Sequence, residues 1–213
     1  MTNNTQAMNT NFVAADFDVF AIPGLEARMS ALIERVRPKL TELGNQLAPH
    51  LTALCGEEMF PHVAKHARRT INPPNDTWVA WANNKRGYKA HPHFQVGMFE
   101  SHLFIIFAVI YESDNKKVFA KHLSEHLQDV RAAVPANFFW SLDHMKPEGT
   151  SHADMNEEAF ETIIHKLQHI QKSEVLCGLR IDRDNPLLAD GEKLLSTIEH
   201  TFEQLLPLYR LAF

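Results

Sequence analysis

Cysteine and glycine are scarce in this chain of 213 residues, and both shortages exclude classes of protein. The two cysteines, Cys55 and Cys177, are isolated and form no Cys-x-x-Cys pair, so a disulfide scaffold is not indicated. We expect them to be reduced core residues of a cytoplasmic protein. The eight glycines form neither a Walker-type loop nor a Gly-x-Gly-x-x-Gly motif. A standard nucleotide-binding fold is therefore not indicated.

Long apolar runs and targeting signals are also missing. The longest apolar run, residues 103–111, is far shorter than the roughly 20 residues that a membrane-spanning helix needs. Residues 1–11 are polar and uncharged, unlike a signal peptide or a transit peptide. We therefore expect a cytoplasmic protein with no membrane partner, in which residues 1–14 form a disordered tail and residues 15–213 form a single domain.

What is present is an ordinary globular composition with an uneven distribution of charge. Hydrophobic residues make up 45% of the chain and charged residues 22%, both close to the average for globular proteins. The net charge is −5. Residues 60–94 hold six lysines and arginines against one acid and carry +5, so the other 178 residues carry −10. The basic stretch is therefore the place to look for a site.

The spacing of apolar residues predicts helices at both ends of the chain and strands in its middle. Helices are predicted over residues 25–36, over 38–54 with a break at Pro49, and over 115–134, 156–171 and 190–211. Strands are predicted over residues 77–83, 94–99, 102–112, 137–142 and 174–182. Residues 60–70 fit an extended strand or a helix, and we favour the strand. Short links between neighbouring strands indicate antiparallel pairing. The prediction is an α+β fold, a single domain with a mainly antiparallel sheet from the chain middle, packed by N- and C-terminal helices.

Residues 60–95, which we call the basic segment, combine cationic groups with histidines and aromatic rings. The fork of an arginine suits a carboxylate or a phosphate, and a lysine adds a compact point charge. Our first hypothesis is therefore that the protein binds an anionic small molecule, such as a phosphate, a nucleotide or a carboxylate. The candidate residues are the charge partners Lys65, Arg68, Arg69, Arg86 and Lys89, the hydrogen-bonding histidines His62, His66 and His93, and the aromatic walls Trp78 and Tyr88.

The same segment carries a family resemblance. The motifs HVAKHARRT-x-NPP-x-DTW, RGYK and PHFQ-x-G resemble the YktB-like family of uncharacterised bacterial proteins. The resemblance extends to the Ile-Pro-Gly at 22–24 and to residues 102–112, and it covers most of residues 17–145. It implies an intracellular α+β protein and transfers no catalytic residues. His91 does not fit the pattern of the family.

Three alternatives to an anion site remain open. The basic residues could be solvated or paired with the acidic remainder of the chain, which would contribute about 0–1 kcal/mol for each exposed pair. One of the histidines could do general acid–base work near neutral pH, which would make the protein an enzyme. Residues 208–213 could pack against a second copy, which would make the chain an interaction module. The negative net charge argues against nucleic acid as a partner.

One histidine motif is typical of metal chemistry. His122-Leu-Ser-Glu125-His126 fits the H-x-x-E-H pattern of inverted zinc peptidases, and on a helix its two histidines lie one turn apart. No third ligand stands out apart from glutamates of the following helix. A short pattern in a chain with 13 histidines also arises by chance.

A second metal option combines His91 and His93, two apart on a strand, with His62 or His66. The neighbouring lysines and arginines would repel a cation. We therefore assign no metal site, and we leave the cofactor unspecified.

Ser141, Asp143 and His144 cluster at the end of a predicted strand. No Gly-x-Ser-x-Gly elbow accompanies them, so the cluster does not indicate nucleophilic catalysis. Neither the reaction nor the oligomeric state follows from the sequence.

Overall fold

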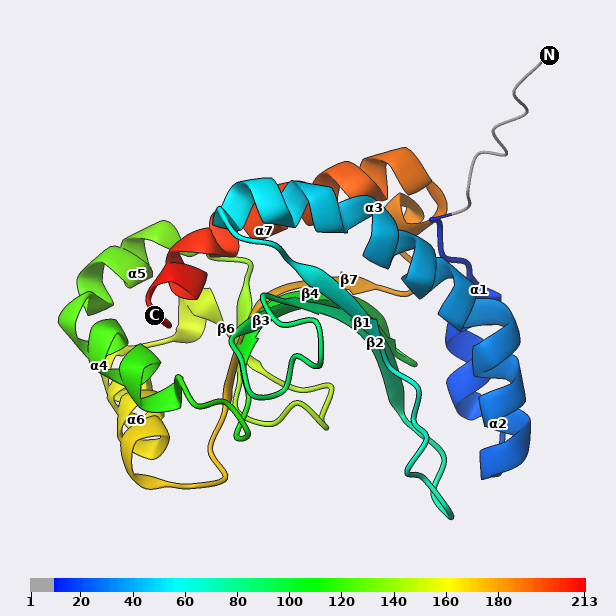
Figure 1. Cartoon of the computed structure of the whole chain (residues 1–213), viewed down its shortest axis with the longest axis horizontal. Coiled ribbons are helices and arrows are strands. Elements are labelled where there is room, and N and C mark those ends of the chain that lie inside the picture. The colour runs from blue at the N-terminus through cyan, green and yellow to red at the C-terminus, as the bar shows by residue number, and fades with distance from the viewer. Residues whose placement is uncertain (1–9) are drawn as a thin grey trace.

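The computed structural model describes residues 10–213, and all of their strands belong to one sheet (Figure 1). The strands are β1 (Phe60–Val63), β2 (Asp76–Ala82), β3 (His93–Phe99), β4 (His102–Val109), β5 (Phe139–Ser141), β6 (Thr150–Ser151) and β7 (Val175–Asp182). Their order across the sheet is β1-β2-β3-β4-β7-β5-β6, and every hydrogen-bonded pair is antiparallel. The predicted α+β fold with an antiparallel sheet is confirmed.

The helices pack mainly on one face and at one end of this sheet. They are α1 (Ala14–Phe17), α2 (Leu25–Ala31), α3 (Arg37–Cys55), α4 (Lys116–Glu125), α5 (Leu127–Ala133), α6 (Glu157–His169) and α7 (Gly191–Arg210). Helices α3 and α7 lie across the same face, with α3 against β1 and β2 and α7 against β3, β4 and β7 (Figure 1). Within residues 10–213, no helix is both long and apolar enough to cross a membrane.

The main core lies between the sheet and these two helices. Trp81 of β2 is fully buried there, and its indole N–H donates a 3.0 Å hydrogen bond to the carbonyl of Gly44 in α3. Its ring meets the ring of Phe202 of α7 edge-on, with 5.7 Å between the centroids. Gly44 permits this close approach, because a Cβ would lie a tight 3.2 Å from the side chains of Pro61 and Val79. Trp81 therefore joins both covering helices to the sheet.

Two helix boundaries differ from the prediction. Pro49 lies inside α3 rather than at a break, since Leu47 and Leu51 on either side of it are buried and hold the helix on the sheet despite the lost N–H. The predicted helix over 115–134 is divided at His126, whose φ of −117° leaves the helical region. The bend allows α4 and α5 each to bury its own apolar side.

Part of the segment that the prediction assigns to a disordered tail, residues 10–14, packs on the rest of the described chain. The expectation for residues 1–9 lies outside the described residues. Phe12, in contrast, is 1% exposed and donates its backbone N–H to the carbonyl of Leu188 at 2.7 Å. The Lys39 ammonium lies 5.5 Å from the centre of its ring. An aromatic anchor within the polar stretch thus fixes residues 10–14 on the domain.

The ambiguous residues 60–70 are extended only at their start. β1 ends at Val63, and residues 64–70 form a loop. His66 adopts a left-handed conformation there, with φ of 52°, and its Nε2 lies 3.2 Å from the hydroxyl of Thr77. The basic segment therefore consists of β1, a loop, β2, a second loop and the first residues of β3.

The second face of the sheet carries no helix in the described part of the chain. Two connections lie over it instead, the 83–92 loop between β2 and β3 and the 142–149 loop between β5 and β6 (Figure 1). We call this surface the open face. Side chains that point towards it include an apolar cluster separate from the main core.

Candidate functional site

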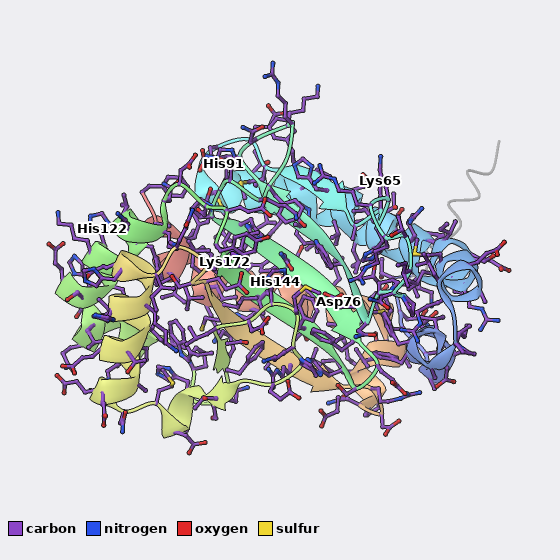
Figure 2. All side chains as sticks on the ribbon, turned by 90° about the horizontal axis from the view of Figure 1, so that it is seen from below. Lys65, Asp76, His91, His122, His144 and Lys172 are labelled. Atoms are coloured by element: carbon purple, nitrogen blue, oxygen red, sulfur yellow. The ribbon has the colours of Figure 1, made fainter. Side chains whose placement is uncertain are left out.

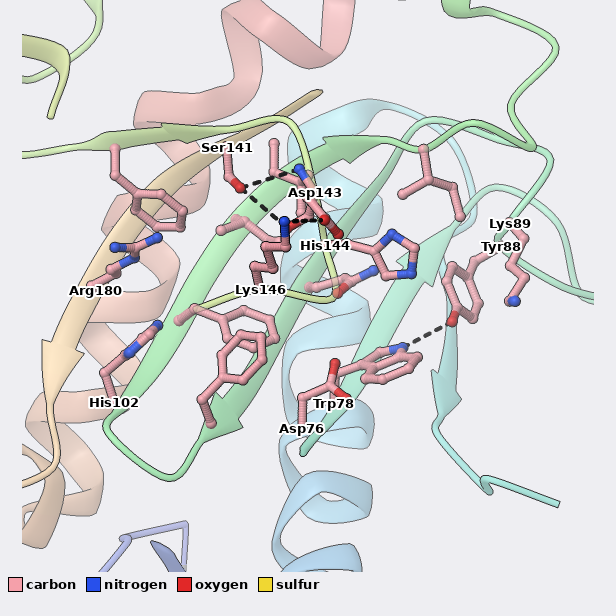
Figure 3. Close-up of a pocket in the computed structure, with 17 residues that line it drawn as sticks. Asp76, Trp78, Tyr88, Lys89, His102, Ser141, Asp143, His144, Lys146 and Arg180 are labelled. Carbon is pink, nitrogen blue, oxygen red and sulfur yellow. Dashed lines mark hydrogen bonds and ion pairs between the residues drawn. The ribbon is translucent and has the colours of Figure 1, made fainter. Parts of the chain in front are cut away.

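A pocket lies on the open face between the two loops (Figure 3). We call it the open-face pocket. Its cavity volume is about 50 Å³, which is small compared with typical small-molecule sites, and the pocket opens to the solvent. Its floor is made by the apolar side chains Phe99, Phe104, Ile106, Ile110, Phe139 and Leu176. Its walls come from the 83–92 loop, with Tyr88 and Lys89, and from the 142–149 loop, with Asp143, His144 and Lys146.

Gly97 of β3 allows this floor to form. A Cβ at this position would overlap the ring of Phe104 and would lie 2.6 Å from the carbonyl oxygen of Thr77. Because glycine has no side chain, the Phe104 ring can lie over β3 and fill the middle of the pocket.

One end of the pocket is defined by Arg180 of β7. Its guanidinium carbon lies 3.8 Å from the centre of the Phe139 ring. Its buried Nε has no hydrogen-bond partner, and no carboxylate of the described residues forms an ion pair with it. Burial lowers the pKa of Arg180, an effect that the charge of Glu148 opposes. Arg180 is thus a half-buried cation that forms no ion pair with a described residue.

His102 of β4 lies beside Arg180. It is 5% exposed, and burial, with the charge of Arg180 adding to it, lowers its pKa to about 4. Its Nδ1 lies 2.8 Å from the hydroxyl of Ser101. At neutral pH His102 is therefore an uncharged imidazole that can hydrogen-bond a ligand next to the guanidinium.

The other end of the pocket is defined by Asp76, the first residue of β2. Its side chain is buried, with the residue 3% exposed, and burial raises its pKa to about 6. The charges of His144 and Arg69 and the adjacent backbone N–H of Asp76 itself oppose this rise, and Asp76 forms no ion pair with any residue in the 10–213 range. Close by, the indole N–H of Trp78 donates a 2.9 Å hydrogen bond to the hydroxyl of Tyr88.

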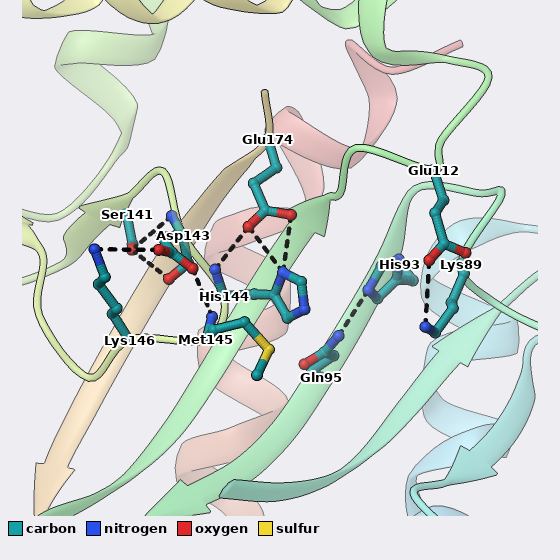
Figure 4. A network of polar contacts seen from close by, with 10 residues as sticks. All are labelled: Lys89, His93, Gln95, Glu112, Ser141, Asp143, His144, Met145, Lys146 and Glu174. Carbon is teal, nitrogen blue, oxygen red and sulfur yellow. Dashed lines mark hydrogen bonds and ion pairs between the residues drawn. The ribbon is translucent and has the colours of Figure 1, made fainter. Parts of the chain in front are cut away.

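His144 reaches into the pocket from the 142–149 loop and is oriented by Glu174 (Figure 4). The Glu174 carboxylate is buried and lies 2.8 and 2.9 Å from the Nδ1 of His144. Burial alone would lower the pKa of His144, but the hydrogen bond and charge of Glu174, with Asp76 and Asp143 adding to them, raise it. Since Nδ1 is engaged, Nε2 is the ring nitrogen left to meet a ligand.

Three of the ten predicted site residues line this pocket, namely Trp78, Tyr88 and Lys89. His93 lies beneath it and is fully buried, with a pKa that burial lowers to about 4. Its Nδ1 lies 2.8 Å from the His91 carbonyl, and its Nε2 lies 2.8 Å from the amide nitrogen of Gln95, which lines the pocket. His93 therefore positions Gln95 as a neutral residue and offers no charge to an anion.

The other six predicted residues lie elsewhere. His62 is bonded to the carbonyl of Asn84 at 2.9 Å, and its ring centre lies 5.9 Å from that of Tyr88, which it supports from behind. Three more line a separate open groove beside α2, and the last two point into the solvent. The groove residues are Lys65, His66 and Arg69, and the solvent-exposed residues are Arg68 and Arg86. The basic segment does not converge on one cationic site.

The residues that the sequence prediction missed are Asp76, His144, Glu174 and Arg180. Two of them stand out by a feature of the sequence. Asp76 is the one acid in the basic segment, and Arg180 is a charged residue within a mainly apolar strand. His144 belongs, with Ser141 and Asp143, to the sequence cluster that does not indicate nucleophilic catalysis.

The histidine motifs do not form a metal centre. His126 lies beyond the end of α4, and the Nδ1 of His122 lies 3.0 Å from the carbonyl of Leu211. Figure 2 shows His122 and His91 away from His144 and Asp76, which lie over the open face. Within the described chain, no group of three or more histidine, cysteine or acidic residues is placed to hold a metal ion.

Comparisons with known proteins show the family of this chain. A family model described as a domain of unknown function (DUF1054) matches residues 12–209. A UPF0637 protein of Bacillus licheniformis is 51% identical over 200 residues, which is 94% of this chain and 95% of the relative. A UPF0637 protein of Bacillus velezensis is 48% identical with the same coverage, and one of Bacillus cereus is 46% identical over 94% of this chain and 96% of its own. The chain therefore belongs to the bacterial UPF0637 family, whose members share this domain of unknown function, as the resemblance of its basic segment indicated.

Proposed function

We propose that the protein binds a small organic anion with an apolar body in the open-face pocket. The observation that carries this proposal is Arg180, a half-buried guanidinium that lies against the Phe139 ring with no ion-pair partner among the described residues and no acceptor for its buried Nε. A cation is costly to hold in this state unless a partner of opposite charge is supplied. An anionic group of the ligand would supply it.

The remainder of the pocket suits the rest of such a ligand. The floor of phenylalanine, isoleucine and leucine side chains would contact an apolar body, at about 25 cal/mol for each Å² removed from water. A carboxylate or sulfonate can accept two parallel hydrogen bonds from an arginine fork. This proposal keeps the predicted class of ligand but moves its cation from the basic segment to β7. Of the predicted cations, Lys89 lies at the rim and is paired with Glu112 at 3.3 Å.

Isothermal titration calorimetry tests the proposal with aromatic anions and a neutral analogue. The probes are 2-naphthoate, 2-naphthalenesulfonate and the uncharged 2-naphthalenemethanol. The variant Arg180→Gln should weaken binding of the two anions by about tenfold or more, the value of a hydrogen-bonded charge pair, and should leave the alcohol nearly unchanged. Arg35→Gln is the matched control, because Arg35 is exposed and does not line the pocket.

Two results would contradict the proposal. One is the absence of binding for both anions. The other is an equal affinity of the anions for Arg180→Gln and for the Arg35→Gln control, which would mean that the Arg180 charge has no role.

A second candidate function is general acid–base catalysis by His144. It is favoured by the Glu174 carboxylate, which fixes the ring through Nδ1 and leaves Nε2 facing the pocket. This arrangement of carboxylate and imidazole is the one that holds a catalytic histidine in a defined tautomer. Incubation of the protein with ester, amide and phosphate-ester derivatives of the naphthyl probes tests it. Turnover that is lost in His144→Gln supports catalysis, and no turnover leaves binding as the function.

A further inference from the structure

Each end of the open-face pocket carries a charged side chain, and the two side chains have opposite signs. At one end the Arg180 guanidinium forms no ion pair with a described residue and its buried Nε has no acceptor, and at the other the Asp76 carboxylate forms no ion pair with a described residue, although the charges of His144 and Arg69 act on it. An ionised carboxylate buried to this degree is unfavourable unless it is paired, and a carboxylate has room for about four hydrogen bonds. The Asp76 carboxylate receives one from its own backbone N–H.

The protein cations closest to Asp76 are held by other groups. The charges of His144 and Arg69 act on Asp76 through space, but neither forms an ion pair with it. His144 is bonded to Glu174, and the Arg69 guanidinium donates to backbone carbonyls at 3.3 and 3.4 Å. The Asp76 carboxylate is therefore available to a cationic partner from outside the chain.

Aromatic rings surround the same end of the pocket. Trp78 and Tyr88 both line it, and the hydrogen bond between them fixes how the indole lies. The faces of tryptophan and tyrosine attract cations, by about 0.5–2 kcal/mol depending on burial. A carboxylate beside two such rings is chemically suited to an ammonium group.

We infer that the ligand is dipolar, with an ammonium group at Asp76 and an anionic group at Arg180, joined by an apolar spacer. This inference rests on the proposed function, because it takes the Arg180 end as the anion site. Asp76 is on β2 and Arg180 is on β7, three strand spacings apart in the order β2-β3-β4-β7. Three spacings correspond to about 14 Å between the strands. Figure 3 shows the two residues on opposite sides of the pocket, with aromatic rings of the floor between them.

The strand separation makes ligand length a test. Calorimetric titrations with 6-aminohexanoate, 8-aminooctanoate and 11-aminoundecanoate vary the distance between the two charges, and their N-acetyl derivatives remove the ammonium alone. We expect one length to bind best and its acetylation to weaken binding by about tenfold or more. Asp76→Asn should cause a similar loss for the amine and none for its acetylated form. Arg35→Gln is again the control.

The outcomes separate this inference from the proposed function. If aromatic anions bind through Arg180, but amino acids bind no better than their acetylated forms, the ligand is an anion only and this inference is overturned. If neither series binds, both proposals fail. Since acetylation is tested on the unchanged protein, the result does not depend on the folding of Asp76→Asn, whose thermal unfolding is measured as a check.

Discussion

Glu174 accepts two hydrogen bonds from His144, one from its backbone N–H and one from its ring Nδ1, each at 2.8 Å. Glu174 directly precedes β7, and His144 belongs to the 142–149 loop. The contact therefore fixes a wall of the open-face pocket to the strand that also carries Arg180. Changes to Glu174 should affect both the loop and the titration of the histidine.

The first prediction concerns Glu174→Gln, which keeps the shape of the side chain and removes its charge. The pKa of His144 should fall, because the carboxylate is what raises it. In the unchanged protein the raised pKa contributes stability that is complete below about pH 6.5 and is lost as the pH rises through the folded value. The loss of stability in the variant, about 1–3 kcal/mol, should thus be larger in acid than in alkaline buffer. Proton NMR titration of the imidazole and urea unfolding measure the two effects, and an unchanged His144 pKa would contradict the prediction.

The second prediction concerns the pH dependence of stability caused by Asp76. Its pKa is raised from 3.8 to about 6 in the folded protein, so the folded state binds this proton more tightly than the unfolded chain. The contribution of Asp76 to the free energy of unfolding should fall as the pH rises from about 4 to about 6 and then stay constant. Asp76→Asn removes this loss, which amounts to about 2–3 kcal/mol above pH 6. Urea unfolding at several pH values compares the two proteins, and parallel pH profiles would show that Asp76 is not perturbed.

The third prediction concerns the pocket floor. Gly97→Ala places a methyl group against Phe104 and the carbonyl of Thr77, so we expect a loss of about 1–3 kcal/mol in stability and a weaker affinity for the naphthyl anions. Gly87→Ala is the matched control, because a Cβ there meets nothing within 4 Å. Thermal unfolding measures the stability of each variant, and calorimetry measures its affinity for the naphthyl anions. A Gly97→Ala protein that behaves like the control would mean that the floor readily rearranges.

The fourth prediction concerns the C-terminal residues that the sequence offered as an interface with a second copy. Leu208, Tyr209 and Ala212 are buried in the core of their own chain, and the Tyr209 hydroxyl donates a 2.7 Å hydrogen bond to Glu57. Deletion of residues 208–213 should therefore cost several kcal/mol, on the scale of about 2–5 for each large buried side chain. Removal of Phe213 alone, which is 47% exposed, should have a small effect. Thermal unfolding measures both, and equal stability of the longer deletion would contradict this assignment.

Much of the fold could be predicted because burial leaves a periodic pattern. β4 is apolar at nearly every position and is buried on both faces, as its sequence indicated. The periodic pattern does not show which strands pair with each other in the sheet. β7 pairs with β4 across the whole of α4, α5 and α6, and no local feature of the sequence records that register.

The candidate site could be predicted only where one segment supplies it. Trp78, Tyr88 and Lys89 come from the basic segment, where the excess of positive charge drew attention to them. Arg180 and His144 reach the same pocket because β7 is placed between β4 and β5. In the sequence they are 36 residues apart, and the order of the strands in the sheet brings them to the same pocket.

The position of β7 in the middle of the sheet also has a consequence for how the protein is made. β1 to β4 are adjacent hairpins that can pair as soon as they are synthesised, but the hydrogen-bonding edge of β4 stays bare until residue 182 has been made. A bare apolar strand edge favours association with other chains. We therefore expect nascent chains that stop before β7 to depend on chaperones, and the open-face pocket to be complete only after β7 has been made.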